Sequence, residues 1–383
     1  MNYVNLIFLS SNWTLNHRKG LHTNINKRLS EWSEVIFIET PLSILYHTFF
    51  KFGKRVLPLI KHKKGIKEVK TFSPLAVFHQ KIWKKIPLTL RFDSWLVSVQ
   101  IKRLIKKKFP KSKVITWANS PYDYAIIKLM KPEKIVYDYY DNFSYDNNGN
   151  LEGTSDALNG ILIADSGLIF CTGRVMYDFA KSMNNNSWYV PNGHNLNSGK
   201  KITKTDLKVE GKIIGYLGNI RDWIDFELIN KLLNSLKENN YLFFIGPVEK
   251  NVSGEIEILK KNNNFKHLNA VKYTEIFSYL KGFDIGIIPF KINRFTEGVL
   301  PYKFFEYIAA DIAIVSTALP DIVPYQSIIN VAKNNDEFVE MCVDENLKLN
   351  KNKPGYDEVR KESTWEKRAD FIESKLKILL NNI

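Results

Sequence analysis

The residues whose spacing points to chemistry lie in FDIGIIPFKINRFTEGVLPYKFFEYIAADIAIVST, residues 283–317. Pro301 opens a predicted helix, a position that suits proline because the first N–H groups of a helix have no partner within it. Lys303 and Glu306 then share one helix face near the positive end of its dipole. A helix start and a lysine can hold phosphate, and a carboxylate can accept from ribose hydroxyls. The segment predicts a nucleotide diphosphate site; a surface Lys–Glu pair on an amphipathic helix is the competing interpretation.

An acidic group suited to proton transfer occurs in VYDYYDNFSYD, residues 136–146. The pattern predicts a strand running into a loop, which would carry Asp138 and Asp141 to the edge of a cleft. There a carboxylate could serve as an acidic catalytic group. A capping or turn-forming aspartate before an Asn-rich loop is the alternative.

Two further loops follow predicted strands and could contact phosphate. In YLGNIRDWIDFELI, residues 216–229, Gly218 and Asn219 would let backbone amides approach a phosphate, and Arg221 would add positive charge. A tight strand-to-helix turn with solvated side chains explains the same residues. In SSNWTLNHRKGLHTN, residues 10–24, Arg18 and Gly20 are candidates for contacting a substrate or its phosphate.

These loops are expected at the ends of alternating strands and helices. The apolar runs VNLIFLS, EVIFIET, KVITWANS, KIIGYLGNI, YLFFIGPV and AIVST each end in small or polar residues. Such a rhythm predicts parallel sheets with ligands at the carboxyl ends of the strands. We expect two Rossmann-like doubly wound α/β domains facing across a cleft, over residues 1–197 and 198–365. A C-terminal helix over 366–383 could cross back to the first domain.

The pattern Asp-x-Gly-x-x-Pro-Phe, a loop, Pro-x-Lys-x-x-Glu-Tyr-x-Ala and a strand ending in Ser-Thr resembles GT-B glycosyltransferases that build bacterial surface polysaccharides. In that family this helix carries the donor site. The resemblance implies Glu306 as the ribose ligand and Lys303 as a diphosphate contact, and it assigns Tyr302 and Tyr273 to the donor site. The implied donor is a nucleotide diphosphate sugar, with UDP favoured, and the usual acceptor is a lipid-linked glycan.

The stretch Tyr-Asp-x-x-Asp-x-Phe-Ser resembles teichuronic-acid-type transferases. The related xanthan-gum glucuronosyltransferase group inverts and uses an aspartate of its first domain as base, which implies Asp141 as the catalytic residue here. Many retaining members carry an acid eight positions before the ribose-binding glutamate. This chain has Gly298 there, with Glu297 beside it, which leaves retention and inversion both open.

The charge of the chain is concentrated in one segment. The 383 residues carry 55 Lys and Arg against 40 Asp and Glu, and residues 51–113 hold 19 of the basic residues and two of the acids. That segment interleaves cations with aromatic and aliphatic residues, which is typical of a surface that contacts anionic lipid headgroups. We therefore expect residues 42–113 to face a membrane, with the protein peripheral on its cytoplasmic side. A solvated lysine face is the alternative.

Other classes of protein are less well supported by the sequence. No apolar run is long enough to span a bilayer, the start does not resemble a signal peptide, and two cysteines favour a reducing compartment. No Asp-x-Asp or His-x-x-x-His pattern occurs, so we expect no metal and no cofactor besides the nucleotide-sugar co-substrate. A GT-B-fold sugar-nucleotide epimerase and a basic nucleic-acid-binding protein remain as alternatives, and the second lacks any known nucleic-acid-binding motif.

Overall fold

The structure is a computed structural model. It describes residues 2–13, 18–46, 60–63 (backbone only), 69–83, 85–195, 204–205, 207, 209–272, 275–347 and 352–381. Tyr273 and the domain boundary predicted at 197–198 lie outside the described residues, as does much of the predicted basic segment between 47 and 68.

The chain forms two compact units, each described here by itself. Unit 1 comprises Met1–Tyr145, Leu151–Val190 and Arg368–Ile383, and unit 2 comprises Asp146–Asn150 and Pro191–Lys367. The short segment 146–150 groups with unit 2 because the Asn147 side chain donates to Asp222 and its carbonyl accepts from the Asn293 side chain. The sequence pattern did not predict this excursion.

As far as it is described, unit 1 is built on an eight-stranded sheet in the order β10-β9-β8-β7-β1-β2-β5-β4. Neighbouring strands are parallel except for the edge pair β4 and β5. The strands are β1 (Tyr3–Phe8), β2 (Glu34–Ile38), β4 (Ile60–Lys63), β5 (Val69–Phe72), β7 (Lys113–Ala118), β8 (Lys134–Tyr139), β9 (Leu168–Cys171) and β10 (Ser187–Tyr189). A separate short pair joins β3 (Leu42–Ser43) to β6 (Leu75–Ala76).

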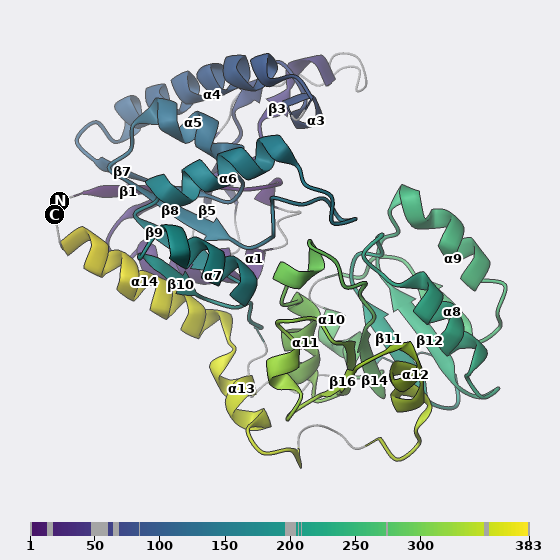
Figure 1. Ribbon diagram of the computed structural model, residues 1–383. Helices are drawn as coiled ribbons and strands as arrows, with labels where there is room; N and C mark the ends of the chain where they lie inside the picture. The colour runs from purple at the N-terminus through teal and green to yellow at the C-terminus, as the bar shows by residue number, and fades with distance from the viewer. Residues whose placement is uncertain are drawn as a thin grey trace. The chain divides into compact units, whose positions relative to one another are not determined.

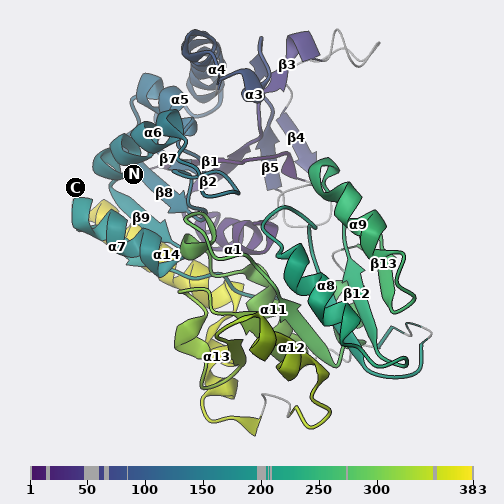
Figure 2. The ribbon, with the colours of Figure 1, turned by 45° about the vertical axis from the view of Figure 1, so that its right-hand side comes forward.

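Helices cover both faces of this sheet. Helices α4, α5 and α6 lie on one face, and α1 and α14 lie on the other (Figures 1 and 2). Their bounds are α1 (Lys19–Leu29), α3 (Gln80–Trp83), α4 (Pro87–Lys108), α5 (Asp123–Met130), α6 (Gly153–Asp165), α7 (Arg174–Met183) and α14 (Trp365–Asn381). Apolar side chains of α4, α5 and α6 pack with those of the strands, and Leu21, Ile25 and Leu29 of α1 are buried as well, as a two-sided parallel sheet requires.

The described part of unit 2 holds a six-stranded, fully parallel sheet in the order β13-β12-β11-β14-β15-β16. The strands are β11 (Ile213–Leu217), β12 (Tyr241–Ile245), β13 (Phe265–Leu268), β14 (Ile285–Ile288), β15 (Ala313–Thr317) and β16 (Asn330–Ala332). The helices are α8 (Phe226–Asn234), α9 (Ser253–Leu259), α10 (Ile276–Leu280), α11 (Tyr302–Ala310), α12 (Asn335–Val343) and α13 (Tyr356–Glu362). The prediction of two doubly wound α/β units is confirmed.

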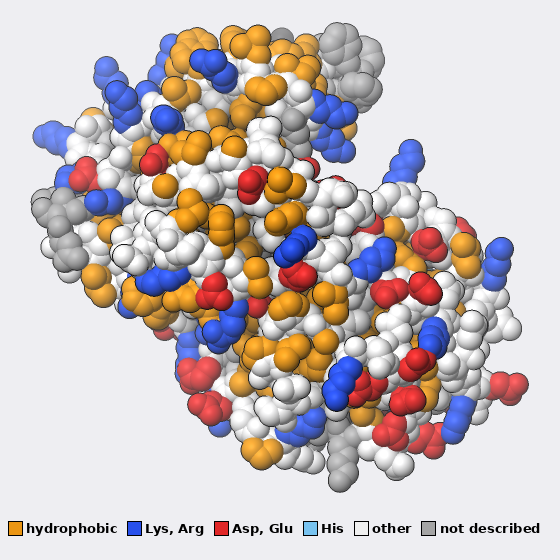
Figure 3. Space-filling model, in the orientation of Figure 1, with side chains coloured by type: hydrophobic (Ala, Val, Ile, Leu, Met, Phe, Trp, Pro, Cys, Tyr) orange, Lys and Arg blue, Asp and Glu red, His pale blue; other side chains and the backbone are white. Residues whose placement is uncertain are grey.

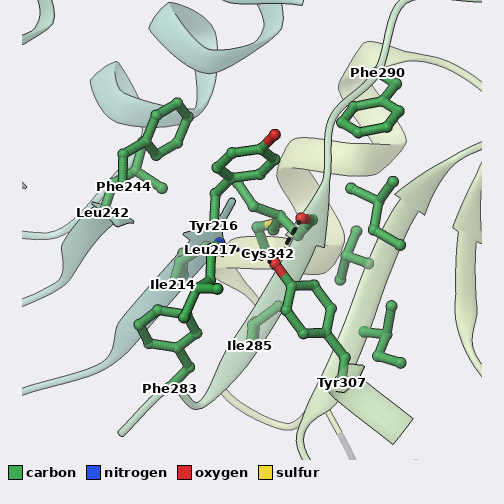
Figure 4. Close-up of a cluster of buried hydrophobic side chains, with 14 of the residues drawn as sticks. Ile214, Tyr216, Leu217, Leu242, Phe244, Phe283, Ile285, Phe290, Tyr307 and Cys342 are labelled. Carbon is green, nitrogen blue, oxygen red and sulfur yellow. Dashed lines mark hydrogen bonds between the residues drawn. The ribbon is translucent and has the colours of Figure 1, made fainter. Parts of the chain in front are cut away.

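The core of unit 2 fixes α11 against the sheet. Figure 4 shows Tyr307 of α11 among the apolar side chains of β11 and β14, with its hydroxyl directed at the strands. The Leu217 backbone N–H donates to Tyr307 Oη at 3.2 Å, and Tyr307 Oη lies 3.4 Å from the Ile287 carbonyl that accepts from it. One buried hydroxyl thereby ties the helix to both central strands.

Candidate active site

The sheet of unit 2 reverses its strand order between β11 and β14. Strands β12 and β13 follow β11 toward one edge, whereas β15 and β16 follow β14 toward the other. Ligands of open parallel sheets bind outside the carboxyl ends of the strands at such a switch point. Here those ends are Gly218, after β11, and Pro289, after β14.

Gly218 and Lys303 meet at this switch point. Gly218 has φ +141°, and a Cβ on it would lie 2.6 Å from Lys303 Nζ and 2.8 Å from Lys303 Cε. The backbone conformation favours glycine here, and an added Cβ would displace the end of the Lys303 side chain. Lys303 Nζ also lies 4.6 Å from the ring centroid of Tyr216 and 5.5 Å from that of Phe290, so aromatic faces help to hold the ammonium group.

Glu306 lies one helical turn beyond Lys303 and is almost enclosed. Its side chain is 7% exposed, and no hydrogen bond to its carboxylate is found among the described residues. Burial raises the pKa of Glu306 to about 7, while the positive charge of Lys303 opposes that shift. A buried carboxylate with free acceptor oxygens is suited to bind hydroxyl donors from a ligand.

Tyr307 positions this pair, and sequence reasoning missed it. Its hydroxyl ties α11 to β11 and β14, and burial raises its pKa well above the ordinary value, which keeps the phenol protonated. Gly286 of β14 makes room for the ring, since a Cβ there would lie 2.7 Å from Tyr307. A glycine inside an otherwise aliphatic strand is the signal that could have revealed this close approach.

The other two predicted residues after β11, Asn219 and Arg221, already contact neighbouring residues of unit 2. Asn219 is exposed, and its carbonyl accepts from Tyr216 Oη at 2.7 Å. Arg221 Nη2 lies 2.6 Å from Glu249 Oε1, and its guanidinium carbon lies 5.0 Å from the centroid of the Trp223 ring. Positive charge is thus present near the switch point, but Arg221 is already paired with Glu249.

Tyr302, the first residue of α11, contacts the start of α14. Its hydroxyl accepts from Trp365 Nε1 at 2.7 Å, and the two ring centroids are 5.4 Å apart. Tyr302 therefore lies at the N-terminus of α11, next to Lys303 in the sequence. Its predicted role in donor binding stays a prediction, as does that of Tyr273.

In unit 1, the structure joins two residues that the sequence analysis treated separately. Arg18 Nε lies 2.9 Å from Asp138 Oδ2, and Arg18 Nη2 lies 2.7 Å from Asp138 Oδ1, with both side chains buried. His22 Nε2 stands 3.9 Å from the same carboxylate. Burial raises the pKa of Asp138, and the guanidinium of Arg18 opposes this shift. Arg18 and Asp138 therefore form a buried ion pair between the start of α1 and β8, and Asp138 lies within the strand rather than in the loop that follows it.

The other two predicted residues of unit 1 flank this pair. Gly20 is buried in the first turn of α1, and its carbonyl accepts from the Asn24 side chain at 2.9 Å. Asp141 lies just beyond the carboxyl end of β8 and is half-buried, and its carbonyl accepts from the Phe143 N–H at 2.9 Å. This position, at the end of a parallel strand, is one where catalytic groups of such sheets occur.

Comparison with protein-family models finds no match. The chain is 30% identical over 112 residues to a Bacillus subtilis (strain 168) protein described as "Putative teichuronic acid biosynthesis glycosyltransferase TuaH". The match covers 29% of this chain and 28% of that relative, so it spans less than a third of either protein.

Solved structures extend the likeness to the whole chain. Sucrose-phosphate synthase from Thermosynechococcus elongatus superposes with a TM-score of 0.74 at 11% identity and full coverage of both chains. Anabaena Alr3699/HepE, solved with UDP and glucose, gives a TM-score of 0.66 at 10% identity over 97% of this chain and 99% of that one. The chain has the GT-B fold. It resembles GT-B glycosyltransferases in fold throughout and in sequence over the shorter match, which confirms the resemblance predicted from its motifs.

The predicted site residues are divided between the two units of the GT-B fold. Gly218, Lys303 and Glu306 come together in the second GT-B unit, where a lysine, a helix N-terminus and a carboxylate can bind phosphate and a diol. Arg18, Gly20 and Asp141 belong to the first GT-B unit.

Two further observations concern only the described residues. No group of three or more His, Cys, Asp or Glu side chains there is arranged to hold a metal ion. Among the described helices, none combines the length and apolar character needed to cross a bilayer.

Proposed function

We propose that this protein is a glycosyltransferase that moves a sugar from a nucleotide diphosphate sugar, with UDP as the favoured nucleotide, to a lipid-linked or polysaccharide acceptor in bacterial surface glycan synthesis. The observation that carries the proposal is the arrangement at the switch point of unit 2. There the end of the Lys303 side chain lies against Gly218, and the buried carboxylate of Glu306 lies one turn away.

The donor site follows from the chemistry of these groups. The diphosphate would lie over Gly218 and receive charge from Lys303 and from the N-terminus of α11. The ribose hydroxyls would donate to Glu306, which favours its charged form. UDP is supported by the fold that this chain shares with Alr3699/HepE, a protein solved with UDP and glucose.

The reaction joins the acceptor hydroxyl oxygen to the anomeric carbon of the donor sugar. The bond between that carbon and the diphosphate oxygen breaks, and the nucleoside diphosphate leaves with the bonding electrons. Lys303 and the helix dipole would stabilise the departing charge. Asp141 would accept the proton of the acceptor hydroxyl as general base. If it does so directly, the transfer is a single displacement that inverts the anomeric centre.

The proposed acceptor is held at the cytoplasmic face of a membrane. The likeness to TuaH, named as a teichuronic acid biosynthesis glycosyltransferase, supports a surface glycan as product. The 19 basic residues between 51 and 113 support an anionic lipid surface as partner.

The test is a thermal-shift measurement of the purified protein with UDP, GDP, CDP and ADP. A nucleotide at 100 times its dissociation constant should stabilise the folded state by about 2.7 kcal/mol. We expect a shift with UDP that Glu306→Ala abolishes. Glu340→Ala, which removes an exposed carboxylate of α12 in the same unit, is the matched control and should keep the shift.

The outcomes separate the competing functions. UDP binding with sugar transfer to a lipid-linked acceptor supports the proposal. UDP binding with donor rearrangement or hydrolysis and no transfer to any acceptor would favour an epimerase. The absence of a shift with every nucleotide, combined with salt-sensitive binding of nucleic acid, would overturn the proposal.

A further inference from the structure

Helix α4 of unit 1 has two apolar faces, and only one of them is buried. Leu90, Val97, Ile101 and Leu104 pack into the core. On the outward face, Leu88 is 72% exposed, Phe92 48% and Trp95 54%. Their spacing places them on one stripe, and the rings of Phe92 and Trp95 stand 6.2 Å apart. Adjacent large apolar side chains exposed on one face indicate a contact surface.

The same stripe becomes cationic toward the end of the helix. Lys102 and Lys106 continue it at helical spacing, and Arg91 and Arg103 flank it, all with exposed side chains. At 1.5 Å per residue, the 22-residue helix presents this sequence of apolar and then basic side chains over about 33 Å. Figure 3 shows hydrophobic side chains gathered over α4 with Lys and Arg beside them.

Helix α4 itself contributes no exposed acidic side chain to this face. Asp93 is the only acidic residue in the sequence from Val69 to Tyr122. It is fully buried, accepting from the backbone of Val77 at 2.7 Å and from Trp83 Nε1 at 2.8 Å. The Asp93 carboxylate is therefore used inside unit 1, and the charged side chains of α4 that face outward are all positive.

We propose that the outward face of α4, defined by Leu88, Phe92, Trp95, Lys102 and Lys106, docks on an anionic lipid bilayer. The three apolar side chains enter the boundary between headgroups and acyl chains, and the cations contact lipid phosphates. The indole of Trp95 suits this depth because its ring is apolar and its N–H is polar. The inference deepens the proposed function and rests on its placement of the acceptor at a membrane.

The observations favour a bilayer over other partners of this face. A nucleic acid backbone would satisfy the cations but would leave the exposed leucine and aromatic side chains without an apolar partner. A second copy of the chain would bring two faces of the same charge together, and like charges oppose association. A bilayer with anionic lipid offers an apolar environment to the three apolar side chains and phosphate groups to the lysines.

The experiment measures binding of the full chain to vesicles by sedimentation. The wild type should bind vesicles that contain phosphatidylglycerol, and it should bind pure phosphatidylcholine vesicles much more weakly. Phe92→Ser combined with Trp95→Ser should weaken binding at least tenfold, because two aromatic side chains no longer leave water. Lys102→Gln with Lys106→Gln should weaken it by about fivefold per charge.

Phe179→Ser is the matched control, because Phe179 is an exposed phenylalanine on α7 of the same unit. This substitution should leave vesicle binding unchanged. The UDP thermal shift, measured on each variant, reports whether the donor site is intact.

Equal vesicle binding by the Phe92/Trp95 variant and the wild type would overturn the inference, as would binding that does not depend on phosphatidylglycerol. Loss of RNA binding or of self-association in that variant, without vesicle binding by the wild type, would assign the face to another partner. If the wild type binds vesicles but shows no thermal shift with UDP, the proposal for α4 is supported and the proposed donor site is rejected.

Discussion

At the scale of single residues, the site depends on a carboxyl group in an environment that disfavours its charge. Glu306 is almost fully buried, and the positive charge of Lys303 offsets only part of the cost of burial. A buried carboxylate is suited to bind a ligand that donates hydrogen bonds, because the ligand then replaces the hydrogen bonds from water that burial removes. The same burial makes the stability of unit 2 depend on pH.

Glu306→Gln should stabilise the protein at pH 8 and have little effect at pH 4. The pKa of Glu306 is raised from its ordinary value of 4.5 to about 7 in the folded state. Between these values the folded state binds a proton that the unfolded state does not, so this residue destabilises the fold increasingly as pH rises from 4.5 to 7. Glutamine removes that cost, a gain on the order of 1–3 kcal/mol at pH 8. Urea unfolding at the two pH values checks this, and an equal effect at both would contradict it.

Gly218→Ala should abolish nucleotide binding at a modest cost in stability. The added methyl group would lie 2.6 Å from Lys303 Nζ at a φ of +141°, so the lysine must move and the backbone is strained. We expect a loss of about 1–3 kcal/mol in stability. Calorimetric titration with UDP is the measurement. Gly254→Ala is the control, because a Cβ there meets nothing within 4 Å. Undiminished UDP binding by the Gly218 variant would show that this contact is not part of the site.

At the scale of elements, the ion pair of Arg18 and Asp138 fixes the start of α1 against β8. The two residues are 120 positions apart in the sequence, and each is bound by two short contacts to the other. The next residues after β8 lead to Asp141, so this pair also sets where the proposed base begins its loop.

Asp138→Asn should destabilise unit 1 by about 3–5 kcal/mol, because it removes the negative charge that faces the buried guanidinium of Arg18 in this ion pair. Arg18→Met with Asp138→Leu should cost less, since both charges of the pair are then removed. Thermal unfolding of the single and double variants makes the comparison. A double variant less stable than Asp138→Asn would argue against this account.

The elements could be predicted from the sequence more fully than their contacts. Apolar runs that end in small or polar residues marked most strands, and Pro301 marked the N-terminus of α11, where it is the N-cap. The partner of Arg18 could not be predicted, because local patterns carry no information on pairs so distant in sequence. Tyr307 was missed for the same reason: its aromatic ring fits any buried helix face, and only the fold places its hydroxyl against two strands.

At the scale of the whole molecule, α14 belongs mainly to unit 1 although it follows unit 2 in the sequence. From Arg368 onward the helix groups with unit 1, where Ala369, Ile372 and Leu376 are buried. Asp370 pairs with Arg28, and Trp32 Nε1 donates to Glu373 at 2.7 Å. Residues 368–381 therefore complete a unit whose other parts lie before residue 191 in the sequence.

Leu376→Ala should lower the stability of unit 1 by about 2–5 kcal/mol, because it removes a fully buried side chain from the packing of α14. UDP binding, which we propose for unit 2, should be unchanged. Ile378→Ala, on the exposed face of the same helix, should have a small effect. Thermal unfolding followed with and without UDP distinguishes the two units, and equal effects of both substitutions would contradict the role of α14.

The late position of α14 has a consequence for synthesis. When a ribosome has released residues 1–190, unit 1 still lacks residues 368–381, and the apolar surface that they will cover stays open. At about 5–20 residues per second, the wait for the missing helix is about 10–40 s. During that time unit 2 is translated and can fold. A nascent chain arrested after residue 190 should therefore be cut by protease within unit 1 and be held by chaperones, whereas the finished chain should resist.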